Sequence, residues 1–207
     1  MSSFDQQQEA IKHKFSSAPP ASPVVSCPKG ALTEQEAKQW FDDFKSREEI
    51  PWDYPNDCCY NRAHVMAREL QAVGVDVGKV WNYAPSANIG EFLRVATPND
   101  PKGYVEWGYH VAPTVPVADP HGQVHRIVID PSIASAPITP DQWKALQGQP
   151  HSSLVATSAS PYYRDQNGRV YAGVDPSDRQ RPPTHDEVQT IFDRHRRARA
   201  LNWIGKE

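Results

Sequence analysis

Apolar side chains recur at helical spacing in two segments of the first third of the chain. The first segment opens with a capping box of Thr33 and Glu36, and one of its faces carries Ala37, Trp40, Phe41 and Phe44. Pro51 is expected to end this helix. The second segment runs from about residue 59 to 73, before Gly74 as a C-cap, and its apolar face carries Ala63, Met66, Ala67, Leu70 and Val73. The pattern therefore predicts two amphipathic helices.

After Gly74 the pattern changes to short runs typical of strands, separated by clusters of Pro, Asn, Asp and Gly. These runs are VGKVWNYA, EFLRVAT, YVEWGYHVA and QVHRIVID. A short helix is predicted over 139–147, and a hairpin is expected to turn at Asn167-Gly168. Thr184 and Glu187 open a last helix with a basic end, DRHRRARA.

Helices that precede an antiparallel sheet indicate an α+β fold. Residues 1–30, polar and then rich in Pro, Ser and Ala, read as a flexible N-terminal tail, and residues 31–207 as a single catalytic domain. The length of 207 residues fits this division, and 38% hydrophobic residues can supply a core.

Charge and composition narrow the range of partners. A net charge of −3 and a pI near 6.2 give no reason to expect nucleic acid. No stretch has the apolar length of a membrane span, and the first residues lack the apolar core of a secretory signal. We therefore expect no membrane partner, and secretion or delivery into a target cell by a route that needs no signal peptide.

The segment DCCYNRAH, residues 57–64, places two of the three cysteines side by side. If Asn56 or Asp57 caps the second helix, Cys58 and Cys59 lie in its first turn, where backbone N–H groups and the helix dipole favour a thiolate. The same N–H groups could hold an oxyanion. Cys59 continues the core-facing stripe and is the better nucleophile. The alternative is that both are ordinary buried thiols.

A nucleophilic cysteine needs a base, and the base needs a group that orients it. The strands around ADPHGQ form a hairpin, and a turn centred on Pro120 sets His110 directly opposite Asp130. An aspartate in that position would hold the imidazole tautomer. Pro113 and Pro116 could break the strand or shift its register, and a structural role for His110 remains open.

Other histidines and aromatic residues allow further readings. His121 and His125 could suggest a metal site, but residues four apart on a strand are about 13 Å apart, so no metal is expected. Trp52, Trp107 and Tyr109 are core residues or, where they adjoin the site, walls of a substrate slot. No glycine-rich phosphate loop, paired zinc motif or serine elbow occurs in the sequence.

The ordered set CYNRAH, WGYHVA and VIDPS resembles the bacterial protein glutaminases, also called protein-deamidating enzymes, over residues 52 to 135. The resemblance implies a papain-like or transglutaminase-like core, with the nucleophile at the N-terminus of a helix packed on an antiparallel sheet. It also implies a catalytic triad of Cys59, His110 and Asp130. Cys58 departs from the glycine expected before the nucleophile.

The activity implied by the resemblance is the hydrolysis of glutamine side chains in proteins or peptides to glutamate and ammonia, with no cofactor. Related domains occur in secreted bacterial effectors and toxins, so the resemblance also suggests that role, with an immunity or carrier protein as a further partner. A cysteine peptidase or transglutaminase could use the same residues. An inactive papain-like binding module is a third alternative.

Overall fold

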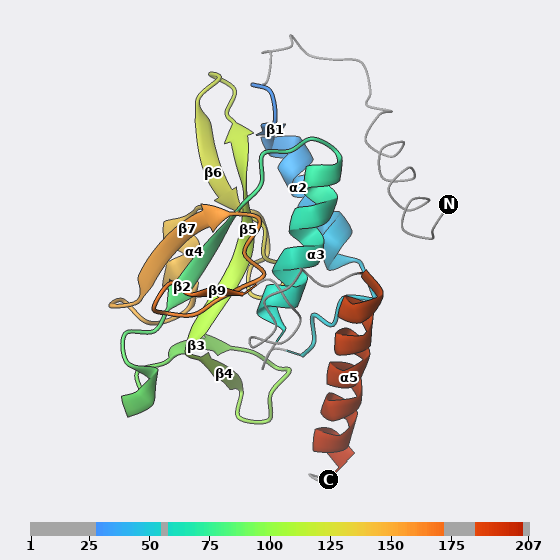
Figure 1. Ribbon diagram of the computed structural model, residues 1–207, viewed down its shortest axis with the longest axis vertical. Coiled ribbons are helices and arrows are strands. Elements are labelled where there is room, and N and C mark those ends of the chain that lie inside the picture. Colours follow the sequence, from blue (N-terminus) through green and yellow to red (C-terminus); the bar gives the residue numbers. More distant parts are fainter. Residues whose placement is uncertain (1–27, 55–57, 172–184, 205–207) are drawn as a thin grey trace.

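A five-stranded mixed sheet forms the centre of the molecule, as the computed structural model shows for residues 28–54, 58–171 and 185–204 (Figure 1). The strand order is β1-β5-β2-β7, and β6 pairs with the other edge of β5. The strands are β1 (Leu32–Thr33), β2 (Gly78–Tyr83), β5 (Tyr109–Ala118), β6 (Val124–Val128) and β7 (Ser153–Ser158). Among these strands only the β1–β5 pair is parallel. The sheet is therefore mixed, whereas a purely antiparallel sheet was predicted.

Two helices, α2 (Glu34–Lys45) and α3 (Cys59–Ala72), cover one face of the sheet (Figure 1). The N-terminal half of α3 shares an apolar cluster with Val111, and its C-terminal half shares another with Val115 and Val117. The helix therefore runs in the same direction as β5, with its first residue near the first residue of the strand. Helix α5 (His185–Ile204) packs beside α3.

The opposite face of the sheet is covered by α4 (Pro140–Leu146), whose Trp143 is completely buried against Val80, Ala112 and Val128. The remaining elements are the pair β3 (Leu93–Ala96) and β4 (Tyr104–Trp107), the pair β8 (Tyr163–Arg164) and β9 (Val170–Tyr171), and the 3₁₀ turn η1 (Ala87–Ile89). The result is an α+β architecture with a layer on each face of the sheet.

Local capping signals are confirmed at two helices. Thr33 with Glu36, and Thr139 with Gln142, form complete capping boxes. The prediction that the first helix extends to Pro51 was wrong, because α2 ends at Lys45. Its last carbonyl groups accept hydrogen bonds from the backbone N–H of Ser46 and, at Phe44, from the indole of Trp52, so the termination depends on a tertiary contact.

The start of α3 differs from the prediction at one residue. Cys59 is the first helical residue, but Cys58 is the N-cap and not part of the first turn. Cys58 has φ 73° and ψ 7°, a left-handed conformation in which a non-glycine residue is strained. The predicted caps Asn56 and Asp57, and most of the predicted tail with Cys27, lie outside the described residues.

The strand predictions are confirmed in outline, with β4 and β5 separated at Gly108 and with β7 not anticipated. Pro113 and Pro116 do not interrupt β5. The backbone of Pro113 faces the edge of β5 that pairs with β6, and its carbonyl group accepts from Ile129, just beyond the end of β6. Pro116 lies beyond Thr114, where the pairing of β5 with β2 ends. Neither proline therefore removes a hydrogen bond from these two ladders. The hairpin pairs Thr114 with Val128, so its centre is His121 and not Pro120.

Candidate active site

His110 and Asp130 are in direct contact, although the register differs from the predicted one. Asp130 lies two residues beyond the end of β6, and the pairing is shifted by two positions relative to the predicted one, which keeps Asp130 and His110 on the same face. His110 Nε2 lies 2.8 Å from Asp130 Oδ2, and the two side chains are 1% and 4% exposed. The predicted histidine–carboxylate pair is therefore present in the fold.

Asp130 is held as a carboxylate by three neighbours. Burial alone would raise its pKa, but the charge and hydrogen bond of His110, with hydrogen bonds from Ser132 and Trp143, lower the pKa to about 2. Trp143 donates from Nε1 to Oδ2 over 2.7 Å, and the Ser132 backbone N–H and hydroxyl group donate to Oδ1. An ionised carboxylate fixed in this way can orient the imidazole and stabilise its protonated form.

The His110 ring lies between two indoles. Trp107 stacks at a centroid distance of 4.6 Å with an interplanar angle of 9°, and Trp143 at 5.4 Å and 22°. With Nε2 committed to Asp130, the other ring nitrogen, Nδ1, is buried and has no hydrogen-bond partner in the described part of the chain. The ring is thus held by its neighbours, with Nε2 paired to Asp130 and Nδ1 without a hydrogen-bond partner in the described residues.

Cys59 lies at the N-terminus of α3, beside the start of β5. The residue is 6% exposed, and its apolar cluster contains Ala63, Trp81, Tyr83 and Val111. Val111 and the partly buried Tyr109 of that cluster are the two chain neighbours of His110. N–H groups in the first turn of a helix have no acceptor within the helix, and the helix dipole favours an anion there. This position suits a thiolate nucleophile.

The aromatic residues predicted to line the substrate slot occupy three different places. Tyr109 belongs to the surroundings of Cys59 and contacts Tyr163 edge-on at 5.6 Å. Trp107 stacks on His110. Trp52 lies below the end of α2, where its Nε1 donates to the Phe44 carbonyl group over 2.9 Å. Of these three aromatic residues, Tyr109 is therefore the one that packs against the cluster of Cys59.

Two residues of the site were missed by sequence reasoning, Trp143 and Ser132. Ser132 had a detectable signal, because a hydroxyl residue two positions after an aspartate commonly closes a turn on it. Trp143 had none: it is 13 positions from Asp130 and reaches the carboxylate only when α4 packs on the sheet.

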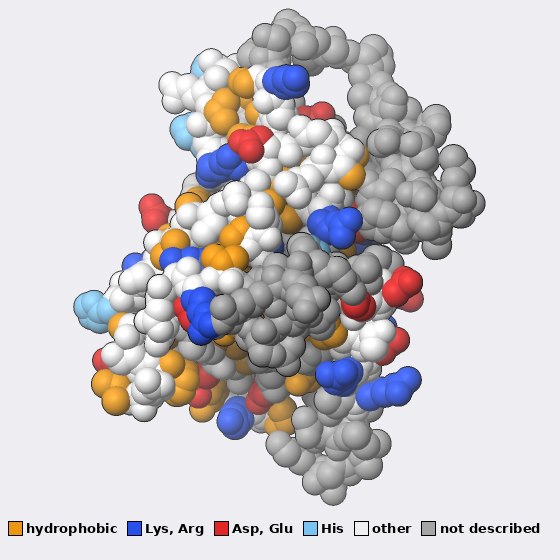
Figure 2. Space-filling model, viewed as in Figure 1, with side chains coloured by type: hydrophobic (Ala, Val, Ile, Leu, Met, Phe, Trp, Pro, Cys, Tyr) orange, Lys and Arg blue, Asp and Glu red, His pale blue; other side chains and the backbone are white. Residues whose placement is uncertain are grey.

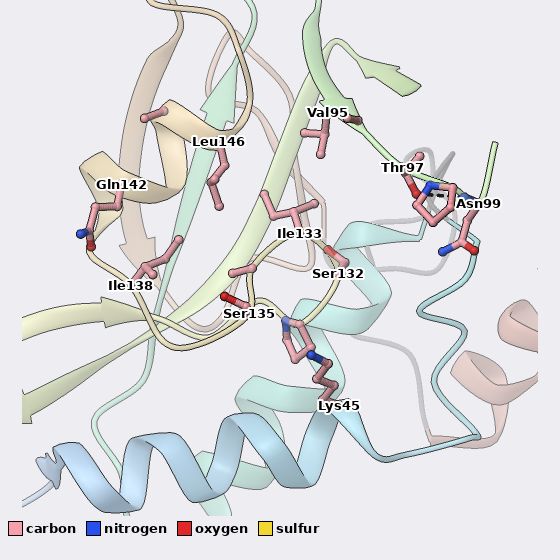
Figure 3. Close-up of a pocket in the computed structure, with 15 residues that line it drawn as sticks. Lys45, Val95, Thr97, Asn99, Ser132, Ile133, Ser135, Ile138, Gln142 and Leu146 are labelled. Carbon is pink, nitrogen blue, oxygen red and sulfur yellow. Dashed lines mark hydrogen bonds between the residues drawn. The ribbon is translucent and has the colours of Figure 1, made fainter. Parts of the chain in front are cut away.

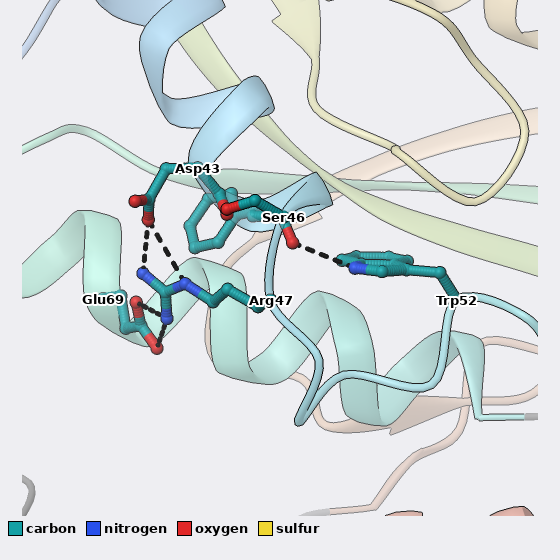
Figure 4. A network of polar contacts seen from close by, with 6 residues as sticks. Asp43, Ser46, Arg47, Trp52 and Glu69 are labelled. Atoms are coloured by element: carbon teal, nitrogen blue, oxygen red, sulfur yellow. Dashed lines mark hydrogen bonds and ion pairs between the residues drawn. The ribbon is translucent and has the colours of Figure 1, made fainter.

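A buried ion-pair network fastens α3 to α2 (Figure 4). Arg47 Nη1 lies 2.8 Å from Oε1 and 2.6 Å from Oε2 of Glu69, with hydrogen-bond geometry only at Oε1, and its Nη2 lies 2.7 Å from Asp43 Oδ2. Burial raises the pKa of Glu69, and Arg47 partly opposes that change. The network holds the helix that carries Cys59 in position against its neighbour.

A groove of about 700 Å³ lies on the α4 side of the molecule (Figure 3). The loop that follows Asp130 forms one wall of it through Ser132 and Ile133, with Val95 and Leu146 facing them and Lys45 at the rim. Neither Cys59 nor His110 lines this groove. Its position therefore gives it no direct part in the chemistry of the thiol.

The described surface shows charges of both signs dispersed among polar residues on the face in Figure 2. In the described ranges, no helix is long and apolar enough to cross a membrane. No group of three or more His, Cys, Asp or Glu residues in those ranges could hold a metal ion. His125 Nε2 instead lies 3.9 Å from a carboxylate oxygen of Asp119.

Comparison with solved structures finds the same fold in protein-glutaminases. The solution structure of protein-glutaminase from Chryseobacterium proteolyticum has a TM-score of 0.57 and 24% identity, with 70% of this chain and 82% of that chain covered. A crystal structure of protein-glutaminase gives 0.60 and 22%, covering 80% and 88%, and one of pro-protein-glutaminase gives 0.58 and 23%, covering 80% and 62%. The expected papain-like α+β fold is thereby confirmed.

No curated protein matches the sequence significantly. The family model described as glutaminase, however, matches residues 37–147, more than half of the chain. The matched region contains α3, β5 and α4, and with them Cys59, His110 and Asp130. The chain therefore belongs to the glutaminase family and is an enzyme, a glutamine-deamidating hydrolase.

Proposed function

We propose that this enzyme deamidates glutamine side chains of proteins or peptides through a triad of Cys59, His110 and Asp130. The observation that carries the proposal is the buried His110–Asp130 pair, which leaves Nδ1 as the ring nitrogen available for proton transfer, at the end of β5 where α3 begins. The alternation of β5 turns His110 away from the face that carries Val111. In this proposal the thiol reaches the ring around the start of β5, because the strand begins at Tyr109, one residue before His110.

In the proposed reaction, the Cys59 thiolate attacks the side-chain carbonyl carbon of glutamine to form a tetrahedral oxyanion. The backbone N–H of Cys59 at the helix N-terminus donates to that oxygen. As the carbon–nitrogen bond breaks, His110 gives a proton to the departing nitrogen and ammonia leaves. His110 then takes a proton from water, whose oxygen displaces the thiolate from the thioester and yields glutamate. Asp130 stays ionised throughout and steadies the imidazolium.

The test uses the purified chain with an unfolded protein as substrate. Ammonia release and glutamine-to-glutamate conversion, mapped by mass spectrometry, are expected for the wild type and lost in Cys59→Ala. Cys58→Ser is the matched control, because it changes the adjacent buried cysteine and is expected to retain activity. New chain termini, or cross-links without new glutamate, would instead identify a peptidase or a transglutaminase. Inertness of both thiols to alkylation near neutral pH would identify a binding module.

We further propose, from the resemblance to effector and toxin domains, that the enzyme acts on proteins of a target cell. Expression of the wild type inside a bacterial or host cell is expected to slow growth, and Cys59→Ala is expected not to. A protein that binds and inhibits the enzyme in the producing cell would then be its immunity partner. Equal growth with both forms would refute this role and leave the deamidase proposal intact.

A further inference from the structure

Asn82 in β2 is the direct cross-strand partner of His110 in β5. Both side chains are almost completely inaccessible, at 0% and 1% exposure. Directly opposed residues in an antiparallel pair have Cβ atoms about 4.5–5.5 Å apart and lie on the same face of the sheet. The amide of Asn82 therefore adjoins the imidazole proposed as the proton-transfer group.

The amide of Asn82 is buried without hydrogen bonds. Within residues 28–54, 58–171 and 185–204, neither Oδ1 nor Nδ2 of Asn82 has a partner, and the same holds for Nδ1 of His110. Buried polar groups in native proteins are nearly always hydrogen-bonded, because an unsatisfied one loses its hydration without compensation. A donor and acceptor left unpaired beside the proposed base indicate a place built for a ligand that has both.

The surroundings of Asn82 make a structural reason for this amide hard to find. Its neighbours on the same face of β2 are Val80 and Ala84, which are buried in apolar clusters. An apolar side chain would suit such a position. Asn82 also lies one rung from the end of the β2–β5 ladder, which closes with Tyr83 opposite Tyr109. The preceding and following residues, Trp81 and Tyr83, point to the other face of β2 and belong to the cluster of Cys59, so Asn82 shares its face with His110.

We infer that Asn82 recognises the primary carboxamide of the substrate glutamine. This inference rests on the proposed deamidase function and deepens it. The Asn82 Nδ2–H would donate to the substrate carbonyl oxygen, and Oδ1 would accept from the substrate N–H. Both groups then gain the partners that they lack, and the substrate nitrogen is held beside the proposed proton donor, His110. A carboxylic ester of the same shape has no N–H for Oδ1, so only the amide uses both contacts.

The experiment compares two peptides that differ only in one side chain, glutamine or the γ-methyl ester of glutamate. Asn82→Leu keeps the length of the side chain and removes its polar atoms. We expect kcat/KM to fall about 100-fold or more for the glutamine peptide, which loses both contacts, and to fall less for the ester, which loses only the donation from Nδ2 to its carbonyl oxygen. We also expect the Tm to rise, because an unsatisfied buried amide is replaced by an apolar group.

Gln147→Leu is the matched control, because Gln147 is also fully buried and its Oε1 has no partner in the described residues. It is expected to leave the ratio of amide to ester turnover unchanged. Asn82→Ala provides a second variant with the same expected loss of that ratio, should the leucine be too large to fold. An unchanged ratio of amide to ester turnover in the Asn82 variants would overturn the inference, while amide turnover by the wild type upholds the deamidase function. A wild type inactive on both peptides would overturn both.

Discussion

Lys79 is a cationic residue placed completely inside the protein, and its burial should be measurable as a pH-dependent stability. The side chain is 0% exposed, and its Nζ donates to the Pro161 carbonyl group over 2.6 Å. Burial lowers the pKa of this amine from 10.5 to about 7. Because the folded-state pKa is the lower one, the unfolded chain binds the extra proton between about pH 7 and 10.5. Unfolding free energy therefore rises with pH across that window.

The magnitude follows from the two pKa values. At about 1.4 kcal/mol per pH unit, the interval corresponds to a penalty of about 5 kcal/mol that is fully present below pH 7 and vanishes above 10.5. Lys79→Met removes the titrating group, and it also removes the hydrogen bond to Pro161, worth about 1–2 kcal/mol. At pH 7 we expect the variant to be more stable than the wild type by about 3–4 kcal/mol.

Urea unfolding of both proteins at pH 7 and pH 9 measures this difference. The advantage of Lys79→Met is expected to shrink by about 2 kcal/mol between the two pH values, since the wild type alone gains stability there. Other titrating groups cancel in the comparison. Lys38→Met is the control, because it makes the same substitution at a lysine whose side chain is 65% exposed. A pH-independent difference for Lys79→Met would refute the reasoning and show that the amine is hydrated in the folded protein.

Three further predictions concern the site and its support. Asp130→Asn is expected to lower kcat on the order of a thousandfold with a glutamine peptide, and an unchanged kcat would exclude the triad. The variant should also lack about 2 kcal/mol of unfolding free energy, measured in urea, that the wild type has above pH 3.8 and loses as the pH falls to 2. Cys58→Gly is expected to be about 1 kcal/mol more stable to urea than Cys58→Ala, because only glycine is unstrained at φ 73°, and the reverse order would show that this φ is not imposed. Arg47→Met is expected to cost about 3–5 kcal/mol at pH 8, because it leaves a buried Glu69 carboxylate unpaired. That cost should diminish towards pH 5 as Glu69 takes up a proton, and the same loss at both pH values would contradict the ion-pair assignment.

The hairpin that brings His110 to Asp130 shows how a prediction can succeed with a wrong register. The predicted turn was displaced by one residue, which changes the partner of each residue by two positions. Side chains alternate between faces with a period of two, so both residues stayed on the same face. Although the two residues are not directly opposite, their side chains extend far enough along the sheet for His110 Nε2 to lie 2.8 Å from Asp130 Oδ2.

The sequence by itself determined those features whose causes are local. The capping boxes at Thr33 and Thr139 begin helices because each satisfies backbone N–H groups within four residues. The turn at Gly168 forms because glycine tolerates its positive φ of 86°. The apolar spacing of α3 directs Cys59 and Ala63 towards the sheet.

Only the tertiary structure decided the features that depend on residues distant in the chain. The lowered pKa of Asp130 depends first on His110, 20 positions away, and is supported by hydrogen bonds from Ser132 and Trp143. Asn82 belongs to no recognisable sequence motif. It becomes a candidate binding residue only because the β2–β5 register places its buried amide, which has no hydrogen-bond partner in the described residues, opposite His110. Long-range pairing and burial arise when separate elements pack together, and a local pattern contains no record of which side chains will then meet.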